Sequence, residues 1–194
     1  AILPYVGAGS LLDAGSGGKA TVNAAGDITT TGPNAVGIFA QSVGGGGGVS
    51  GNLGIGAASG GAAMVGSVGG QGSGNTVSVT YQGDIKTAGG GAHGIFAQSA
   101  GPSGAGTVTV TVTGSVIARG ADAHAIMAQS VKQSGSSSVG AANITVTLND
   151  GATVKGGKPG TNNNGAAVQF LDGVDNLLTS NGTLGSANGI SGYA

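Results

Sequence analysis

The chain has 194 residues, of which 45 are glycine, 3% are aromatic and only 7% are charged, against a usual quarter. Tryptophan and cysteine are absent, which excludes disulfides, thiolate chemistry and cysteine metal sites. The positive mean hydropathy of +0.24 argues against disorder. The chain is therefore predicted to use small side chains in a regular, tightly stacked fold.

The formal net charge is −1, and the basic residues stand singly along the chain. Neither nucleic acid nor an anionic membrane is expected as a partner, because no basic cluster is visible. No apolar run approaches the roughly 18 residues of a membrane span. The first residues, Ala1–Tyr5, lack the basic region of a secretory signal, so neither a precursor nor a membrane protein is predicted.

A six-residue phrase recurs along the chain. Gly37–Ser42 (GIFAQS) returns unchanged as Gly94–Ser99 and, loosened, as Ala125–Ser130 (AIMAQS). Partial copies of the phrase at Ala1–Gly7 and Gly189–Ala194 predict that the chain is a segment of a longer array of repeats. Repetition of this kind is typical of repeat architectures, in which each unit buries its apolar face against its neighbours.

Each repeat carries three apolar anchors, separated by 6 and 10 residues in the first three repeats. A fourth set opens the second separation to 14, and a fifth shortens it to 6. The five sets are Val22, Ile28 and Ile38; Val79, Ile85 and Ile95; Val110, Val116 and Ile126; Leu148, Val154 and Val168; and Leu178, Leu184 and Ile190.

Segments around the first anchor, such as Thr107–Thr113 and Asn143–Leu148, alternate β-branched apolar residues with threonine. This period of two predicts half-buried strands. A glycine two residues before the second anchor predicts a bend (Gly26, Gly83, Gly114 and Gly182). The sequence therefore predicts an all-β parallel β-helix, or β-solenoid, with three short strands per coil.

Residues 1–194 are predicted to form one solenoid segment with insertions along one edge. The coils span approximately residues 19–42, 77–99, 107–130, 143–171 and 176–194, and the insertions lie at 43–75, 100–106 and 131–142. The Gly-rich insertion 43–75 predicts either a flexible loop or a degenerate extra coil, since Val49, Ile55 and Val65 repeat the anchor spacing.

The repeated phrase predicts a structural ladder. Its isoleucines should occupy an inward rung position, and its glutamines should stack so that their amides bond from rung to rung. The ladder residues are Ile38, Ile95, Ile126, Gln41, Gln98 and Gln129. The outward threonines should form a flat hydroxyl array on adjacent strands (Thr109, Thr111, Thr113, Thr145 and Thr147).

His93 and His124 share one repeat position and should lie one above the other. No metal site is predicted there, because the other repeats carry Val36, Ala166 and Asn188. Asp27 and Asp84 also share a position, where later repeats have hydroxyl residues.

The chain is not predicted to be an enzyme. Glutamate is absent, Arg119 is the only arginine, and the seven aspartates are spread along the sequence. Glycan cleavage on such a fold would require converging carboxylates. No catalytic, cofactor-binding or metal residue is assigned, and no cofactor is expected.

The phrases Gly37–Gly48 and Gly83–Thr87 resemble the repeats of bacterial autotransporter (type V secretion) passenger regions, and the resemblance covers about Lys19–Tyr193. It implies a right-handed parallel β-helix that is secreted or displayed at the outer-membrane surface, with an outer-membrane barrel in the parent chain. It implies no residue-level site.

The expected function is an extracellular adhesive or structural segment acting in attachment, aggregation or biofilm. Its expected partners are a host or neighbouring-cell surface, a glycan or matrix polymer, or a second copy of the chain. Two alternatives stay open. One is a polysaccharide-active enzyme that depends on Asp84 or Arg119, and the other is a threonine-ladder binder of ice or a regular polymer.

Overall fold

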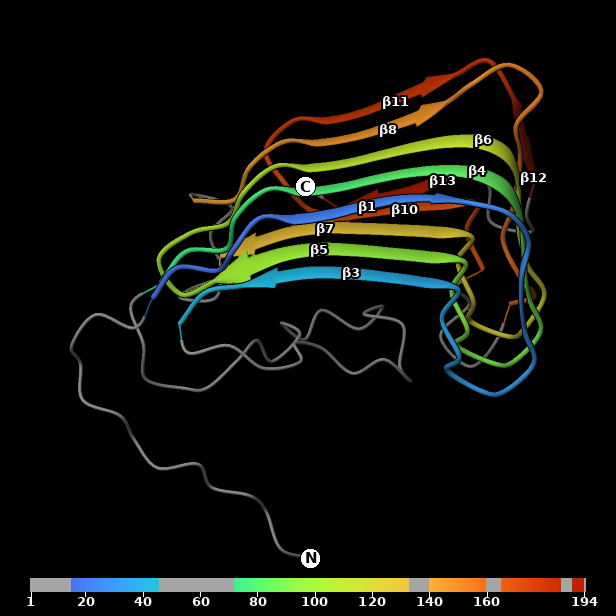
Figure 1. Cartoon of the computed structure of the whole chain (residues 1–194), viewed down its shortest axis with the longest axis horizontal. Coiled ribbons are helices and arrows are strands. Elements are labelled where there is room, and N and C mark those ends of the chain that lie inside the picture. Colours follow the sequence, from blue (N-terminus) through green and yellow to red (C-terminus); the bar gives the residue numbers. More distant parts are fainter. Residues whose placement is uncertain (1–14, 46–71, 133–139, 160–164, 186–189, 194) are drawn as a thin grey trace, which may run out of the picture.

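The computed structural model describes residues 15–45, 72–132, 140–159, 165–185 and 190–193, the last for the backbone only. These residues are all-β, and they form two sheets of parallel strands (Figure 1). They contain no helix, and so none that is long and apolar enough to cross a membrane.

The first sheet contains eight strands. Its central order is β1-β4-β6-β8-β11, and the short strands β2, β9 and β12 extend it beyond a bend. The bounds are β1 Ala20–Ala25, β2 Ile28–Thr30, β4 Val77–Thr87, β6 Val108–Ala118, β8 Ile144–Leu148, β9 Thr153–Lys155, β11 Asn176–Ser180 and β12 Thr183–Gly185.

The second sheet contains five strands in the order β13-β10-β7-β5-β3. The strands of successive repeats follow one another in the same order in both sheets. Each repeat therefore lies between its sequence neighbours in each sheet. The bounds are β3 Ile38–Val43, β5 Ile95–Gly101, β7 Ile126–Lys132, β10 Val168–Asp172 and β13 Ile190–Tyr193.

The predicted first and second strands of a repeat belong to one sheet. In β4 and β6 they are a single strand of 11 residues, because strand pairing continues through Gly83 and Gly114. These glycines have φ values of +136° and +106°, a region that side chains with a Cβ rarely adopt. The strands bend at these glycines and continue towards the second sheet. The bend is at the right of Figure 1.

The anchor register is correct except at one position. Val22, Val79 and Val110 pair in sequence, but the fourth member of this row is Val146, not Leu148. Leu148 pairs with Val112. The cause is a wider turn after β8, where Ala152 N–H donates to Asn149 C=O at 3.0 Å and Gly151 has φ +74°.

The core lies between the two sheets and is built from rows of apolar side chains, most of them Val, Ile, Leu and Ala. Val79, Val110 and Val146 form one buried row, and Ile85, Val116 and Val154 form another. Since each row runs through successive repeats, burial is shared among neighbours rather than concentrated in one repeat.

The described ends of the insertions lie side by side. Gly74 N–H donates to Gly104 C=O at 2.9 Å, and Ala105 N–H donates to Gly140 C=O at 2.8 Å. The inner parts of two insertions, including the possible extra coil at Val49, Ile55 and Val65, lie outside the described residues.

Candidate functional site: the ladders and the threonine face

The isoleucines of the repeated phrase face the core. Ile38 pairs with Ile95 and Ile95 with Ile126, in strict register. Ile95 and Ile126 are fully buried, and Ile38 is 7% exposed. These three residues hold the second sheet against the first, and they present nothing to a ligand.

The glutamines form a directional chain of amides on the opposite side of the second sheet. Gln41 Nε2 donates to Gln98 Oε1, Gln98 Nε2 donates to Gln129 Oε1 at 2.5 Å, and Gln129 Nε2 donates to Asp172 Oδ2 at 2.8 Å. Gln98 is fully buried and Gln129 is 3% exposed. A buried amide without partners is costly, so these bonds stabilise the fold.

The serine of the phrase ties repeats together, a role that the sequence analysis missed. Ser99 Oγ donates to Asn75 C=O at 2.7 Å and accepts Gly106 N–H at 2.8 Å. Ser42 and Ser130 make equivalent pairs of bonds, and each donates to a carbonyl 24 residues earlier. The sequence signal for this role was that the phrase ends in serine in all three repeats, at Ser42, Ser99 and Ser130.

The two histidines stack as predicted, with ring centroids 5.1 Å apart. His93 Nδ1 accepts the backbone N–H of His124 at 3.0 Å, and His124 Nδ1 accepts that of Ala166 at 3.2 Å. Each Nδ1 is therefore unprotonated, which places the proton of the neutral ring on Nε2. The imidazoles link repeats, like the serines.

Burial keeps both rings neutral. It lowers the pKa of His93 to about 3, and the neighbouring His124 adds to the lowering. It lowers the pKa of His124 to about 4, against the opposing effect of the Asp122 carboxylate. Within the described ranges, no three His, Asp or Glu side chains gather in a way that could hold a metal ion.

The aspartates predicted to align do so: Asp84 N–H donates to Asp27 Oδ1 at 3.3 Å, and Ser115 continues the row. Asp84 also forms an ion pair with Lys86 at 3.6 Å, with about half of each side chain exposed. An exposed carboxylate paired with lysine is unlike the facing carboxylates of glycan cleavage.

The outer face of the first sheet is a regular array of hydroxyl groups, which we call the threonine face. Its central row contains Thr80, Thr111, Thr147 and Thr179 on adjacent strands. A parallel row contains Ser78, Thr109 and Thr145. Neighbouring rows are about 6.6 Å apart along a strand, and neighbouring strands about 4.8 Å apart.

The threonine face carries no charge within its strands. The segments Ala20–Ala25, Val77–Gln82, Val108–Thr113, Ile144–Leu148 and Asn176–Ser180 contain no Asp, Glu, Lys or Arg. Its central threonines are half-buried and its outer members exposed, while Leu177 is 56% exposed beside Thr145. Each threonine presents a hydroxyl and a methyl group, so the surface suits an uncharged partner with its own repeat.

No protein-family model, curated protein or solved structure matches the chain.

Proposed function

We propose that the chain forms a parallel β-helix whose successive repeats are its coils, and that the helix is right-handed. The parallel pairing and the common order of repeats in both sheets support this arrangement. Connections between parallel strands of one sheet are right-handed in about 98% of cases, which supports the handedness. The resemblance of the repeats to autotransporter passengers points to the same fold.

On this fold we propose an extracellular adhesive segment of a secreted bacterial surface protein, acting in attachment, aggregation or biofilm. The threonine face is the proposed contact surface, and a neutral glycan or matrix polymer is the proposed partner. The observation that carries this proposal is the uncharged, in-register array of hydroxyl groups over β1, β4, β6, β8 and β11. A repeating partner would gain one weak contact per strand, and these contacts would add up.

The test uses purified chain and microcrystalline cellulose or chitin as neutral polymers. Thr111→Arg places a bulky charge at the centre of the face and should reduce binding about tenfold or more. Thr183→Arg changes an exposed residue of β12, outside the face, and is the matched control. Equal binding by both variants and the unmodified chain would refute the proposed surface.

A second experiment addresses the biological role. Removing this region from the parent protein should reduce attachment of cells to polymer-coated surfaces and reduce their aggregation. Unchanged attachment and aggregation would contradict the adhesive function.

A second candidate function rests on the same rows of threonine. A regular array of hydroxyl and methyl groups could order water and bind ice. This alternative predicts inhibition of ice recrystallisation by the unmodified chain, lost in Thr109→Tyr or Thr111→Tyr. A chain that binds cellulose or chitin but leaves recrystallisation unchanged decides for the adhesive function. The exposed Asp84–Lys86 pair gives the enzyme alternative no support.

A further inference from the structure

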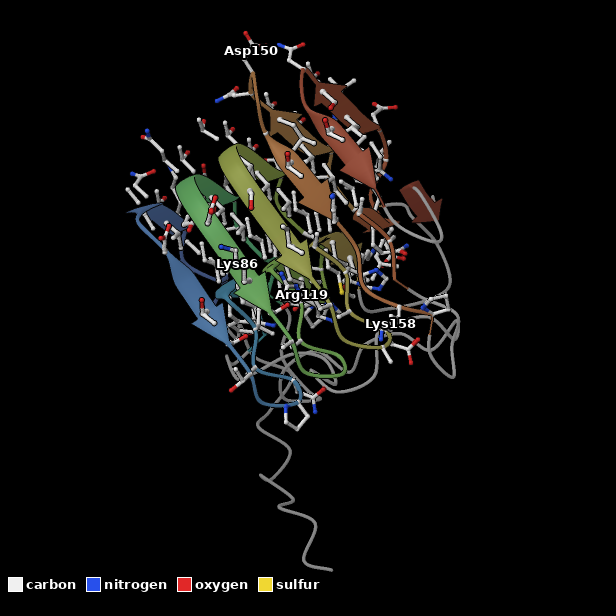
Figure 2. All side chains as sticks on the ribbon, turned by 90° about the vertical axis from the view of Figure 1, so that its right-hand side faces the viewer. Lys86, Arg119, Asp150 and Lys158 are labelled. Atoms are coloured by element: carbon white, nitrogen blue, oxygen red, sulfur yellow. The ribbon has the colours of Figure 1, made fainter. Side chains whose placement is uncertain are left out.

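Basic residues that are scattered in the sequence gather on one side of the fold. Beyond the glycine bend, the second strand segments present a face that is separate from the threonine face, and Figure 2 views it directly. Lys86, Arg119 and Lys158 cross this face in a line. With Lys155 on β9, it holds four of the chain's six basic residues, all of them exposed. We call these four residues the basic face.

Strand register fixes the centre of this face. Lys86 on β4 pairs with Ile117 on β6, and Ile117 pairs with Lys155 on β9. Lys86 and Lys155 are therefore two strand spacings apart, about 9.6 Å, with the half-buried Ile117 between them. Gly185 on β12 leaves room for the stem of Lys155, since an added Cβ would lie 3.5 Å from Lys155 Cγ.

Arg119 lies beside this row. It follows the end of β6, where its N–H donates to Thr87 C=O at 2.8 Å, and strand alternation places it on the same side as Ile117. Lys158 lies in the next turn, where its N–H donates to Gly120 C=O at 3.1 Å. Backbone hydrogen bonds to the preceding repeat thus fix the backbone positions of Arg119 and Lys158.

Three acidic residues lie near the four basic ones, and one of them contacts Lys86 at the centre of the face. Asp84 contacts Lys86 at 3.6 Å, Asp27 precedes Asp84 in the same row, and Asp122, in the turn after Arg119, donates its N–H to Lys158 C=O at 3.1 Å. The Lys86–Asp84 pair is half exposed, so an incoming anion can compete for Lys86 at little cost.

We propose that the basic face binds an acidic polysaccharide that carries one carboxylate on every second sugar, with the polymer running across the strands. Carboxylates of such a polymer recur at a spacing comparable to that of Lys86 and Lys155. Arg119 is placed to bind a carboxylate with two N–H groups. Ile117 gives the apolar face of the intervening sugar a surface to contact.

Nucleic acid fits the same face less well. Proteins that bind single strands combine basic grooves with aromatic side chains on which bases stack. The described strand segments here, Ile28–Thr30, Ile85–Thr87, Val116–Ala118, Thr153–Lys155 and Thr183–Gly185, contain no aromatic residue. A polymer of sugars needs only charge and a small apolar contact, and both are present.

The experiment measures binding of hyaluronan oligosaccharides, which alternate glucuronate with a neutral sugar, to the purified chain at low salt. The paired variant Lys86→Glu with Lys155→Glu should weaken binding at least about tenfold. The paired variant Lys19→Glu with Lys132→Glu changes the net charge equally away from the basic face, and should change affinity less than about twofold. Asp84→Asn should strengthen binding, because it removes the competing carboxylate.

Three results would overturn the inference. These are equal loss in the two paired variants, unchanged binding of carboxyl-reduced hyaluronan, and tighter binding of a poly-dT oligonucleotide or polyphosphate than of hyaluronan. The inference is independent of the adhesive threonine face. Thr111→Arg should leave hyaluronan binding intact, and the Lys86/Lys155 variant should leave binding to cellulose or chitin intact, so the two proposals can fail separately.

Discussion

The two sheets differ in the exposure of their polar side chains. In the first sheet, burial alternates along β6, so valines face the core and threonines reach solvent. In the second sheet, all seven residues of β5 are buried, including Gln98 and Ser99. The outward threonines of the first sheet can bond to water, whereas the buried glutamines and serines of the second sheet bond to other protein groups.

This difference separates surface from scaffold. A threonine on the outer face of the first sheet can be exchanged at little cost, so that face is free to serve a partner. The amide chain, the serine bonds and the histidine pair of the second sheet side have no such freedom. The recurring phrase GIFAQS therefore specifies how repeats join. Its repetition alone could be mistaken for the sign of a functional motif.

The largest expected effect comes from placing a charge in the buried core, which is compared with the same charge on the threonine face. Ile126→Asp puts a carboxylate at a fully buried position and should cost more than about 4 kcal/mol, unfolding several repeats. Thr111→Asp on the threonine face should change the free energy of unfolding by no more than about 1 kcal/mol. Urea unfolding followed by circular dichroism measures both, and equal tolerance would refute the division.

A smaller effect is expected from interrupting the amide chain. Gln98→Ala removes the donor to Gln129 Oε1 and leaves a cavity in a buried site, which should cost about 2–4 kcal/mol. Thr80→Ala removes a polar side chain from the first sheet and should cost well under 1 kcal/mol. The same urea titration compares them, and a loss for Gln98→Ala as small as for Thr80→Ala would mean that the chain of amides contributes little.

The bend of the first sheet can be broken at one glycine. In Gly83→Ala the new Cβ would lie 2.4 Å from Gly26 C=O, at a φ of +136°. We expect a loss of about 2 kcal/mol or more in the free energy of unfolding. Gly15→Ala, where an added Cβ meets nothing within 4 Å, is the control. Similar midpoints of thermal unfolding for the two variants would be evidence against a tight bend.

The remaining prediction is a dependence on pH. Because the folded pKa values of His93 and His124 lie near 3 and 4, below the usual 6.5, the unfolded chain binds more protons between these limits. Stability should be complete above about pH 6.5 and fall below it, by up to about 1.4 kcal/mol per pH unit for each histidine.

The control for this pH dependence is the variant His93→Asn with His124→Asn, which keeps an acceptor at each position but cannot take up a proton. Its stability should fall less steeply between pH 6.5 and 4 in urea titrations at a series of pH values. An identical slope in the variant and the unmodified chain would assign the acid sensitivity to other groups.

Sequence periodicity predicted the strands and most of the register because both follow local rules. Alternating Val and Thr in Val108–Thr113 specifies which face is buried, and Gly83 and Gly114 mark bends that only glycine adopts readily. The prediction failed at Leu148, where counting by six did not account for the wider turn at Asn149–Ala152. Turn length is set by hydrogen bonds that periodicity does not encode.

Contacts between repeats were harder to predict. The bonds of Ser99 and His93 reach backbone atoms of other repeats, so their roles depend on the distance between strands rather than on neighbouring residues. The basic face was missed because Lys86 and Lys155 are distant in sequence and meet only through the register of β4, β6 and β9. The signal was available once each basic residue was assigned a repeat position.

The central claim is that the threonine face binds while the second sheet only supports it. The most direct measurement is the affinity of Thr111→Arg for microcrystalline cellulose or chitin, taken together with its free energy of unfolding in urea. We predict a loss of binding of about tenfold or more with stability unchanged to within about 1 kcal/mol. Undiminished binding by this stable variant would contradict the claim.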